Sequence, residues 1–469
     1  MSGPQPSGRA LSRGDGRPAA PVRLVHLGLG NFFRAHQAWY TDRAPDAADW
    51  GIAAFTGRSG ALADSLAAQD GLYTLITRAA EGDHFEVVSS LATTHPGTDH
   101  DAWCGYLASP DVRGVTLTVT EAGYVRGADG GLDRDRPEIR ADVQALRSDL
   151  AAPVHTAPAR LVAGCAARSR ADAGPLALVS CDNLPGNGEA LARVVGDLAE
   201  MVEPGLAEWV EASVSFVTTM VDRITPRTTP ADRQAVVDAT GREDCCPVAT
   251  EPFSEWVLSG AFPGGRPGWD GAGATITDNI EPYEHRKLWL LNGAHSMLAY
   301  AGSARGHETV AEAVADDTCR DWMQQWWEEA SRHLDLPTAD IQAYRDALLE
   351  RFANPRMHHR LAQIAADGSQ KLPVRILPVL RRERSAGRIP EGAARALAAW
   401  VMHLRGAGAP VDDVRAGQMV ALAGGPLPDA IRHVLDALDP AVGEDAELVA
   451  AVLAGARQLA AEPAGRKPT

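Results

Sequence analysis

The sequence predicts an α/β fold in which a doubly wound, mostly parallel sheet is followed by a mainly α-helical domain. In the first 284 residues, short apolar strands alternate with helical segments, which is the pattern of βαβ units. After about residue 284 only helical patterns follow. A chain of 469 residues is also too long for one core of ordinary size. We therefore expect domains at residues 21–284 and 285–469, after a disordered tail at residues 1–20.

The first βαβ unit opens the sheet domain. Residues 22–29, VRLVHLGL, are a short apolar run, and residues 32–44, FFRAHQAWYTDRA, suit a helix. A second strand is expected at residues 51–57, followed by a helix at residues 61–69. Further strands are expected at FEVVSSL (85–91), GVTLTVTE (114–121), PLALVSC (175–181) and VSFVTTMV (214–221).

The second domain is expected to follow a crossing loop. Residues 260–285 are rich in glycine and proline, which favour turns. Helices are expected at residues 287–302, 320–334, 340–352, 394–406, 428–439 and 446–461.

Composition and charge narrow the classes of partner and compartment. The formal net charge is −16 without a basic stripe, which argues against nucleic acid or anionic membrane as the main partner and favours a small molecule. No apolar run reaches the roughly 18 residues of a membrane span, and the N-terminal tail lacks the apolar core of a secretory signal. The six cysteines form no C-x-x-C pair or zinc-site spacing, so we expect a cytoplasmic protein.

The turn after the first strand resembles a dinucleotide-binding fingerprint, G-x-G-x-x-G. Gly28 and Gly30 suit a tight turn and close approach of a pyrophosphate, but Phe33 occupies the position of the third glycine. Either the following helix sits differently on its sheet, or the phenyl ring fills a gap there. From the motif alone, a cofactor site and a purely structural glycine turn both remain open.

A wider resemblance decides between these readings. The sequence is similar to the polyol-specific long-chain dehydrogenases, the family of mannitol 2-dehydrogenase and fructuronate reductase, over most of residues 22–385 and in the family's order. The matching segments are GLGNFFRAHQAWYTD, QDGLYTLITR, TVTEAGY, SCDNLPGNG, FVTTMVDRITPRTT, EPFSEWVL, EPYEHRKLWLLNGAHSMLAYAG and SQKLPVRILP. The resemblance implies a Rossmann-type first domain, in which we assign cofactor binding to Gly28, Gly30, Asn31 and Phe32.

The resemblance implies NAD as cofactor, with NADP as an alternative. An NAD site usually has an acidic residue about 20 positions after the glycines, at the end of the second strand. Here that strand ends in Thr56, Gly57, Arg58 and Ser59. Arg58 is therefore either a partner for a 2′-phosphate or a solvated loop residue.

A polar triad in the segment KLWLLNGAHS carries the expected chemistry. On an α-helix, at roughly 100° per residue, Lys287 and His295 are about 80° apart and His295 and Asn292 about 60° apart, so all three share one side. A lysine among apolar neighbours can serve as the base for a hydroxyl proton, and amides can hold the developing alkoxide. From the residues alone, a solvated lysine and a satisfied core histidine are the more common explanation of such a pattern.

The resemblance implies specific roles for these side chains. Lys287 would be the general base in oxidation and the acid in reduction, with Asn292 and Asn183 as electrostatic stabilisers. His295 would hydrogen-bond the substrate. Four further residues are candidates. Asp222 would lie beside the cofactor and substrate, or it caps the next turn. Substrate hydroxyls or an anionic end group would accept hydrogen bonds from Arg375, Lys371 and Arg286.

We therefore expect a metal-independent oxidoreductase that interconverts a secondary alcohol and a ketone. The histidines and carboxylates lack metal-ligand spacing, so no catalytic metal is predicted. Fructuronate and mannonate lead as substrates, closely followed by fructose and mannitol. The alternatives are a mannitol 1-phosphate 5-dehydrogenase type of activity on fructose 6-phosphate, and a non-catalytic sugar or nucleotide sensor of the same fold.

Overall fold

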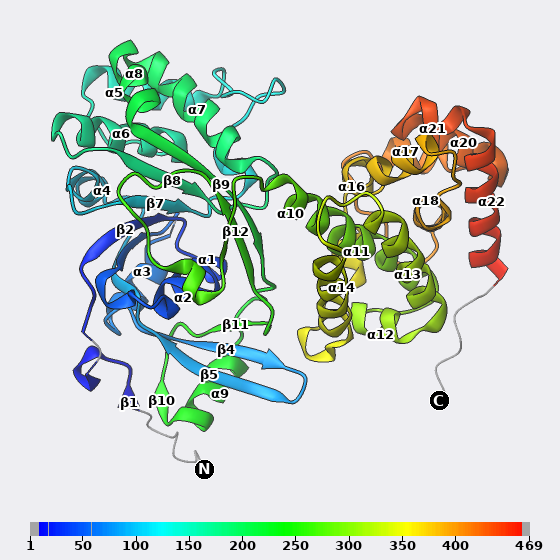
Figure 1. Cartoon of the computed structure of the whole chain (residues 1–469), viewed down its shortest axis with the longest axis horizontal. Helices are drawn as coiled ribbons and strands as arrows, with labels where there is room; N and C mark the ends of the chain where they lie inside the picture. Colours follow the sequence, from blue (N-terminus) through cyan, green and yellow to red (C-terminus); the bar gives the residue numbers. More distant parts are fainter. Residues whose placement is uncertain (1–8, 17, 58, 462–469) are drawn as a thin grey trace. The chain divides into compact units, whose positions relative to one another are not determined.

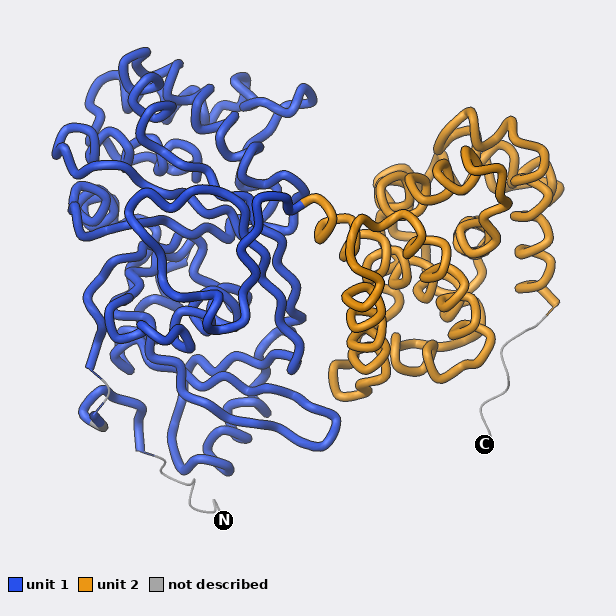
Figure 2. The backbone as a smooth tube through the Cα atoms, in the orientation of Figure 1, with its two compact units in different colours: residues 1–280 blue, residues 281–469 orange. Residues whose placement is uncertain are grey.

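The computed structural model describes residues 9–16, 18–57 and 59–461. The chain forms two compact units, Met1–Ile280 and Glu281–Thr469 (Figure 2). The division lies close to the boundary expected after residue 284. Each unit is described by itself below.

Unit 1 is built on an eight-stranded sheet with the order β13-β12-β9-β8-β7-β2-β3-β6. Figure 1 labels β12, β9, β8, β7 and β2 of this sheet. Six neighbouring strands, in the order β6-β3-β2-β7-β8-β9, are parallel to one another, whereas β12 is antiparallel to β9. Numbered by position in the chain, this is the order 3-2-1-4-5-6 of dinucleotide-binding folds, so the predicted doubly wound sheet is confirmed. The strands are β2 Val22–Leu27, β3 Gly51–Phe55, β6 Leu91–His95, β7 Gly114–Leu117, β8 Leu176–Ser180, β9 Val214–Asp222, β12 Glu255–Ser259 and β13 Thr275–Ile276.

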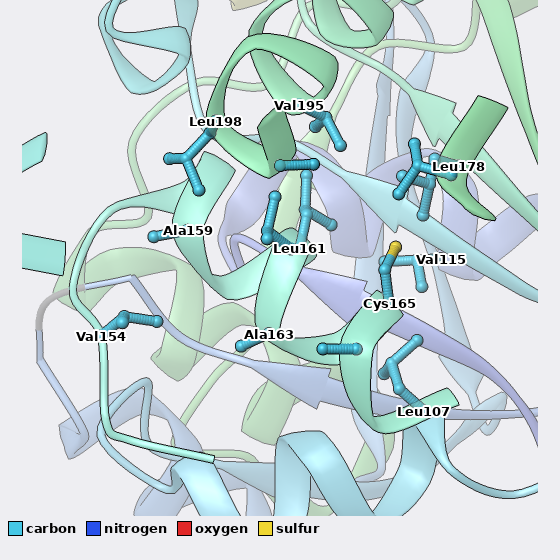
Figure 3. Close-up of a cluster of buried hydrophobic side chains, with 14 of the residues drawn as sticks. Leu107, Val115, Val154, Ala159, Leu161, Ala163, Cys165, Leu178, Val195 and Leu198 are labelled. Atoms are coloured by element: carbon cyan, nitrogen blue, oxygen red, sulfur yellow. The ribbon is translucent and has the colours of Figure 1, made fainter. Parts of the chain in front are cut away.

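Helices cover both faces of this sheet, because alternate strand residues point to opposite sides. On β2, Val25 and Leu27 join one buried cluster and Leu24 joins the other. Figure 3 shows the first cluster, into which α6 contributes Ala159, Leu161, Ala163 and Cys165. Helices α4 His100–Leu107, α5 Pro137–Ser148, α6 Ala157–Arg170, α7 Asn187–Val202 and α8 Pro204–Ser213 line that cluster, and α1 Asn31–Ala35, α2 Gln37–Arg43 and α3 Ala61–Ala67 line the other.

One predicted strand belongs elsewhere. Residues 85–88 of the expected strand at 85–91 lie in β5 Gly82–Val88, which forms a hairpin with β4 Tyr73–Ala79. With β11 Val248–Thr250 these strands make a separate three-stranded sheet, and β6 takes the place in the main sheet. The apolar pattern identified a strand here but not its sheet, because the register depends on distant partners.

The N-terminal tail departs from the expected disorder in its described part. Arg9–Ala10 forms strand β1, which pairs with β10 Arg242–Glu243. Leu11 is 2% exposed, and the Arg13 guanidinium donates to the carbonyls of Ser89 and Leu91. The expectation of disorder is therefore wrong for this stretch, since it packs on unit 1. Residues 1–8 and 17 lie outside the described residues.

Unit 2 is built of helices joined by loops in its described part. Helix α18, Glu391–Leu404, is buried along most of its length, and α11, α13 and α22 pack on it. The other helices are α10 Glu281–Arg286, the π-helix η5 Lys287–Gly293, α11 Ala294–Ala304, α12 Val310–Ala315, α13 Asp317–Ser331, α14 Thr338–Ala353, α15 Leu361–Ala365, α16 Gly368–Arg375, α17 Leu377–Ser385, α19 Ala416–Leu422, α20 Leu427–Leu438, α21 Pro440–Glu444 and α22 Ala446–Ala461. Within the described chain, none of the helices has both the length and the apolar character needed to span a membrane.

Candidate active site

The glycine turn of unit 1 lies where the strand order of the sheet reverses, between β2 and β7. Gly28 has φ +111°, and a Cβ there would stand 2.1 Å from the carbonyl oxygen of Thr118, just after β7. The Thr118 hydroxyl in turn donates to the Gly28 carbonyl at 2.9 Å. Only glycine fits this position. Ligands of open α/β sheets bind at such reversal points, outside the carboxyl ends of the strands.

Gly30 serves a different purpose. It has ordinary backbone angles and precedes the first turn of α1. A Cβ at this position would have a single neighbour, the Gly28 carbonyl oxygen, at 3.5 Å. Glycine is therefore not required by the protein's own packing here, and its absent side chain leaves space beside the N–H groups of the first helical turn, which have no partner within the helix.

Phe33 occupies the gap that the third fingerprint glycine would close. Its ring is fully buried and stacks on the imidazole of His26 from β2, with ring centroids 3.4 Å apart and planes 7° from parallel. Burial lowers the pKa of His26 to about 3, so this imidazole is neutral at neutral pH. Thr116 and Thr118 hydrogen-bond its two nitrogens at 2.8 and 3.1 Å. The phenyl ring thus fills the space between helix and sheet, one of the two expected solutions.

Replacing Phe33 with the glycine of the usual fingerprint should therefore lower the stability of unit 1. We expect Phe33→Gly to destabilise unit 1 by about 3–5 kcal/mol, the usual cost of truncating a buried phenylalanine, because the His26 ring loses its stacking partner. The measurement is the thermal unfolding transition of the variant, with Phe32→Gly as the half-buried control. A Phe33→Gly variant as stable as the wild type would show that the stack contributes nothing.

Two of the four turn residues assigned to the cofactor are engaged with the protein itself. The side-chain oxygen Oδ1 of Asn31 accepts from Arg34 at 2.7 Å, and its side-chain nitrogen Nδ2 donates to the Thr228 hydroxyl at 3.4 Å. Phe32 is half-buried and stacks on His36. Arg58, the expected reader of a 2′-phosphate, lies outside the described residues, so its role stays a prediction.

Asn183 lies in a loop that two buried side chains hold in place. Asp182 accepts from the Thr120 backbone at 2.6 Å and from the Tyr124 hydroxyl at 3.1 Å. Asn187 donates to the Asp182 carbonyl at 2.9 Å. These bonds fix the loop after β8 and leave Asn183 exposed. Asp222, the last residue of β9, is 4% exposed.

The catalytic candidates of unit 2 lie on a π-helix, not on the α-helix assumed from the sequence. Residues Lys287–Gly293 form this turn, whose hydrogen bonds run from i to i+5. The expected α-helical angles are therefore wrong. Lys287 and Asn292, five residues apart, lie one turn apart, and both side chains are half-buried.

Two tryptophans of α13 explain the unusual helix. The indole N–H groups of Trp326 and Trp327 donate, each at 2.8 Å, to the backbone carbonyls of Trp289 and Leu290. Gly293 makes room for this approach, since a Cβ there would stand 2.7–2.9 Å from the Trp326 ring. The indoles satisfy carbonyl groups that an α-helix would use internally. Widened turns of this kind are frequent at functional sites.

His295 follows the π-helix as a buried imidazole. Its Nε2 has no hydrogen-bond partner among the described residues. Burial lowers the pKa of His295 well below its usual range, and the charges of His359, Arg351 and Arg375 lower it further. Its ring packs against Phe352 and His359. A neutral imidazole therefore holds a buried, unsatisfied nitrogen in positive surroundings.

Arg375, from the end of α16, reaches the same segment. Its Nη1 donates to the Ser296 hydroxyl at 3.1 Å and to the Asn292 carbonyl at 3.4 Å. These are its only side-chain hydrogen bonds within the described chain, so Nε and Nη2 remain available. Lys371 donates to the Ile364 carbonyl at 3.3 Å, and burial, then Arg375, lowers its pKa. Arg286 is 5% exposed, with its guanidinium over the Tyr344 ring.

Family models match both units in turn. The Rossmann domain of mannitol dehydrogenase matches residues 22–271, and the C-terminal domain of mannitol dehydrogenase matches residues 279–459. The chain belongs to the mannitol dehydrogenase family. The resemblance inferred from the sequence motifs is thereby confirmed.

Individual relatives within the mannitol dehydrogenase family are similar over most of their length. A D-mannonate oxidoreductase of Escherichia coli (strain K12) is 38% identical over 394 residues, which cover 82% of this chain and 80% of the relative. The Pseudomonas fluorescens mannitol 2-dehydrogenase, solved as a ternary complex with NAD and D-mannitol, is 32% identical with a TM-score of 0.76, covering 96% of this chain and 93% of that one. A D-sorbitol dehydrogenase in substrate-free form is 28% identical with a TM-score of 0.88, covering 97% and 96%.

Several residues that shape these sites escaped the sequence analysis. Thr118 fixes the glycine turn, Trp326 and Trp327 hold the π-helix, and Ser296 receives Arg375. The adjacent tryptophans of the segment MQQWW were a visible signal, although their hydrogen bonds to a distant helix were not. Among the described residues, no three histidine, cysteine or acidic side chains are grouped as a metal site would require.

Proposed function

We propose that this chain is an NAD-dependent oxidoreductase that interconverts a secondary alcohol and a ketone of a sugar alcohol or sugar acid. The observation that carries the proposal is the arrangement in unit 2. The π-helix sets Lys287 and Asn292 one turn apart, and His295, whose Nε2 has no hydrogen-bond partner among the described residues, follows in the next helix. Arg375 donates to the Asn292 backbone carbonyl and keeps further N–H groups available. Membership of the mannitol dehydrogenase family, and NAD in a solved relative, support the same activity.

The glycine turn of unit 1 fits the dinucleotide. Gly28 makes the turn possible, and Gly30 leaves the approach to the first turn of α1 open. Asn31 and Phe32 would flank the nucleotide, and Asp222 would lie by the cofactor and substrate. When bound, NAD supplies the hydride acceptor.

Lys287 would take the hydroxyl proton in oxidation and return it in reduction. A half-buried lysine can serve in this role, because its amine accepts a proton when neutral and donates one when charged. The amides of Asn292 and Asn183 would donate to the oxygen as it gains negative charge. Every group in this scheme is a protein side chain.

The end of the substrate away from the reacting carbon would be bound by His295, Arg375 and Lys371 of unit 2. Nε2 of His295 would hydrogen-bond a hydroxyl, which would satisfy its buried nitrogen. Arg375 and Lys371 would bind an anionic end group. The guanidinium N–H groups of Arg375 that remain available favour a carboxylate-bearing substrate, so we place fructuronate and mannonate ahead of fructose and mannitol. We also assign the chain to the cytoplasm, which six unpaired cysteines support.

An activity panel tests this assignment. Fructuronate, tagaturonate, fructose and fructose 6-phosphate are each supplied with NADH, and nucleotide oxidation is followed by absorbance. We expect fructuronate to give the highest kcat/KM. Arg375→Ala should lower kcat/KM for fructuronate by about tenfold to a hundredfold, because a charged hydrogen bond is worth about 1.5–3 kcal/mol, and should affect fructose less. No turnover with any of the four would refute the proposal.

A further inference from the structure

Arg160 differs from every other buried arginine of unit 1. Arg34, Arg168 and Arg223 each donate hydrogen bonds from their guanidinium groups to backbone carbonyls. Arg168, on the same helix α6, donates to five of them: Leu107, Ser109, Ala173, Gly174 and Pro175. Arg160 is only 9% exposed as a residue, yet its guanidinium donates no hydrogen bond within the described chain.

Among the described residues, no carboxylate forms a hydrogen bond or ion pair with this guanidinium. Burial lowers the pKa of Arg160, and the negative charge of Asp142 raises it in part, although Asp142 forms no hydrogen bond with Arg160. Its oxygens already accept from the His155 backbone at 3.0 Å and from the Thr156 backbone and hydroxyl at 2.9 and 2.7 Å. A guanidinium at the end of a largely buried side chain, with no protein acceptor among the described residues, would gain from an anion that binds there.

The position of Arg160 identifies which anion. A Cβ at Gly97 would stand 3.0 Å from Nη1 of Arg160 and 2.3 and 2.5 Å from the carbonyl oxygens of Thr56 and Gly57. Arg160 therefore reaches from α6 to the carboxyl end of β3. In dinucleotide-binding folds this strand end lies beside the 2′ position of the adenosine ribose, where an acidic residue binds the hydroxyl or an arginine binds a 2′-phosphate.

The surroundings of this strand end suit a phosphate. Thr56, Gly57 and Ser59 bring no negative charge. The nearby carboxylate of Asp99 is bound at 2.9 Å by His95, whose ring stacks on Phe55 at the end of β3. The Thr56 hydroxyl accepts from the Gly97 backbone at 2.9 Å, which holds the loop after β6 in place.

We propose that Arg160 binds the 2′-phosphate of NADP, so that this chain accepts the 2′-phosphorylated cofactor as well as NAD. The inference rests on the proposed nucleotide-dependent function. It adds a specificity residue from α6, about 100 positions beyond the strand end where such residues are normally sought.

Binding of nucleotide fragments tests this without catalysis. The full chain is titrated calorimetrically with adenosine 2′,5′-bisphosphate, with adenosine 5′-monophosphate and with inorganic phosphate. We expect the bisphosphate to bind at least about tenfold more tightly than the monophosphate, because it gains a charge-assisted hydrogen bond. Arg160→Gln should remove this difference while the affinity for the monophosphate stays within about twofold. Arg160→Lys should keep part of the difference.

Arg170→Gln is the matched control, since it removes an exposed charge from the same helix and should leave the difference intact. Equal affinity of the wild type for the two nucleotides would overturn the inference, and that comparison needs no variant. Equal weakening of both nucleotides by Arg160→Gln would also overturn it, as would phosphate alone binding as tightly as the bisphosphate. The titrations contain no sugar, so their results can be interpreted even if none of the sugars in the activity panel is turned over.

Discussion

Replacing Lys287 with alanine is expected to lower kcat by about 10²- to 10⁴-fold, the usual contribution of a general acid–base group. Affinity for NAD should stay unchanged, because the glycine turn that we assign to the nucleotide lies in unit 1. The π-helix should also persist, because it is fixed by carbonyl contacts to Trp326 and Trp327 and not by the lysine side chain. Steady-state turnover with fructuronate, together with NADH binding by fluorescence, measures both parts.

Lys371 provides the control for this experiment. It is a second half-buried lysine of unit 2, but its ammonium donates to the Ile364 carbonyl on another helix. Lys371→Ala should therefore raise KM for an anionic substrate and leave kcat within a few fold. If both lysine variants lost kcat equally, the loss would reflect general damage to unit 2, and the special role of Lys287 would be refuted.

A pair of glycine variants should separate folding from nucleotide binding. In Gly28→Ala, the new methyl group would stand 2.1 Å from a backbone oxygen, at a φ of +111° that strains any L-residue. We expect a loss of about 3 kcal/mol or more in stability, from strain and overpacking together. The measurement is the unfolding midpoint of unit 1, by circular dichroism.

Gly30→Ala is expected to do the opposite. The protein itself offers its methyl group only one contact, at 3.5 Å, so stability should change by less than about 0.5 kcal/mol. The methyl group would, however, occupy the space that we assign to the pyrophosphate, which should weaken NAD binding by about 1–3 kcal/mol. Full NAD affinity in this variant would contradict the assignment of the turn.

The fold was predictable because its signals are local. Apolar strands alternating with helices, and a glycine turn after the first strand, are enough to indicate a doubly wound sheet. The hairpin of β4 and β5 was missed because strand pairing depends on distant register. The sequence did not decide how Phe33 is accommodated, because its phenyl ring fits only when the His26 ring of β2 stacks against it.

The candidate site was predictable in its residue types but not in its geometry. Lys287, Asn292 and His295 were singled out, yet their helix is a π-helix because indoles from α13 hold its carbonyls. Such a long-range hydrogen bond leaves no periodic trace in the sequence. Arg160 was missed for a similar reason, because an arginine in a helix becomes notable only when its burial and its missing acceptor are both known.

The pH dependence of sugar oxidation tests the central claim, that the amine of Lys287 carries the proton. In the wild type, kcat/KM for mannonate oxidation should rise with pH through one ionisation, because only the neutral amine accepts the hydroxyl proton. The measurement compares the wild type with Lys287→Ala in buffer containing chelator, over the pH range in which both stay folded. We predict that the rise disappears in the variant and that chelator leaves the wild type active. The same rise in the variant, at the same pH, would contradict the role of Lys287.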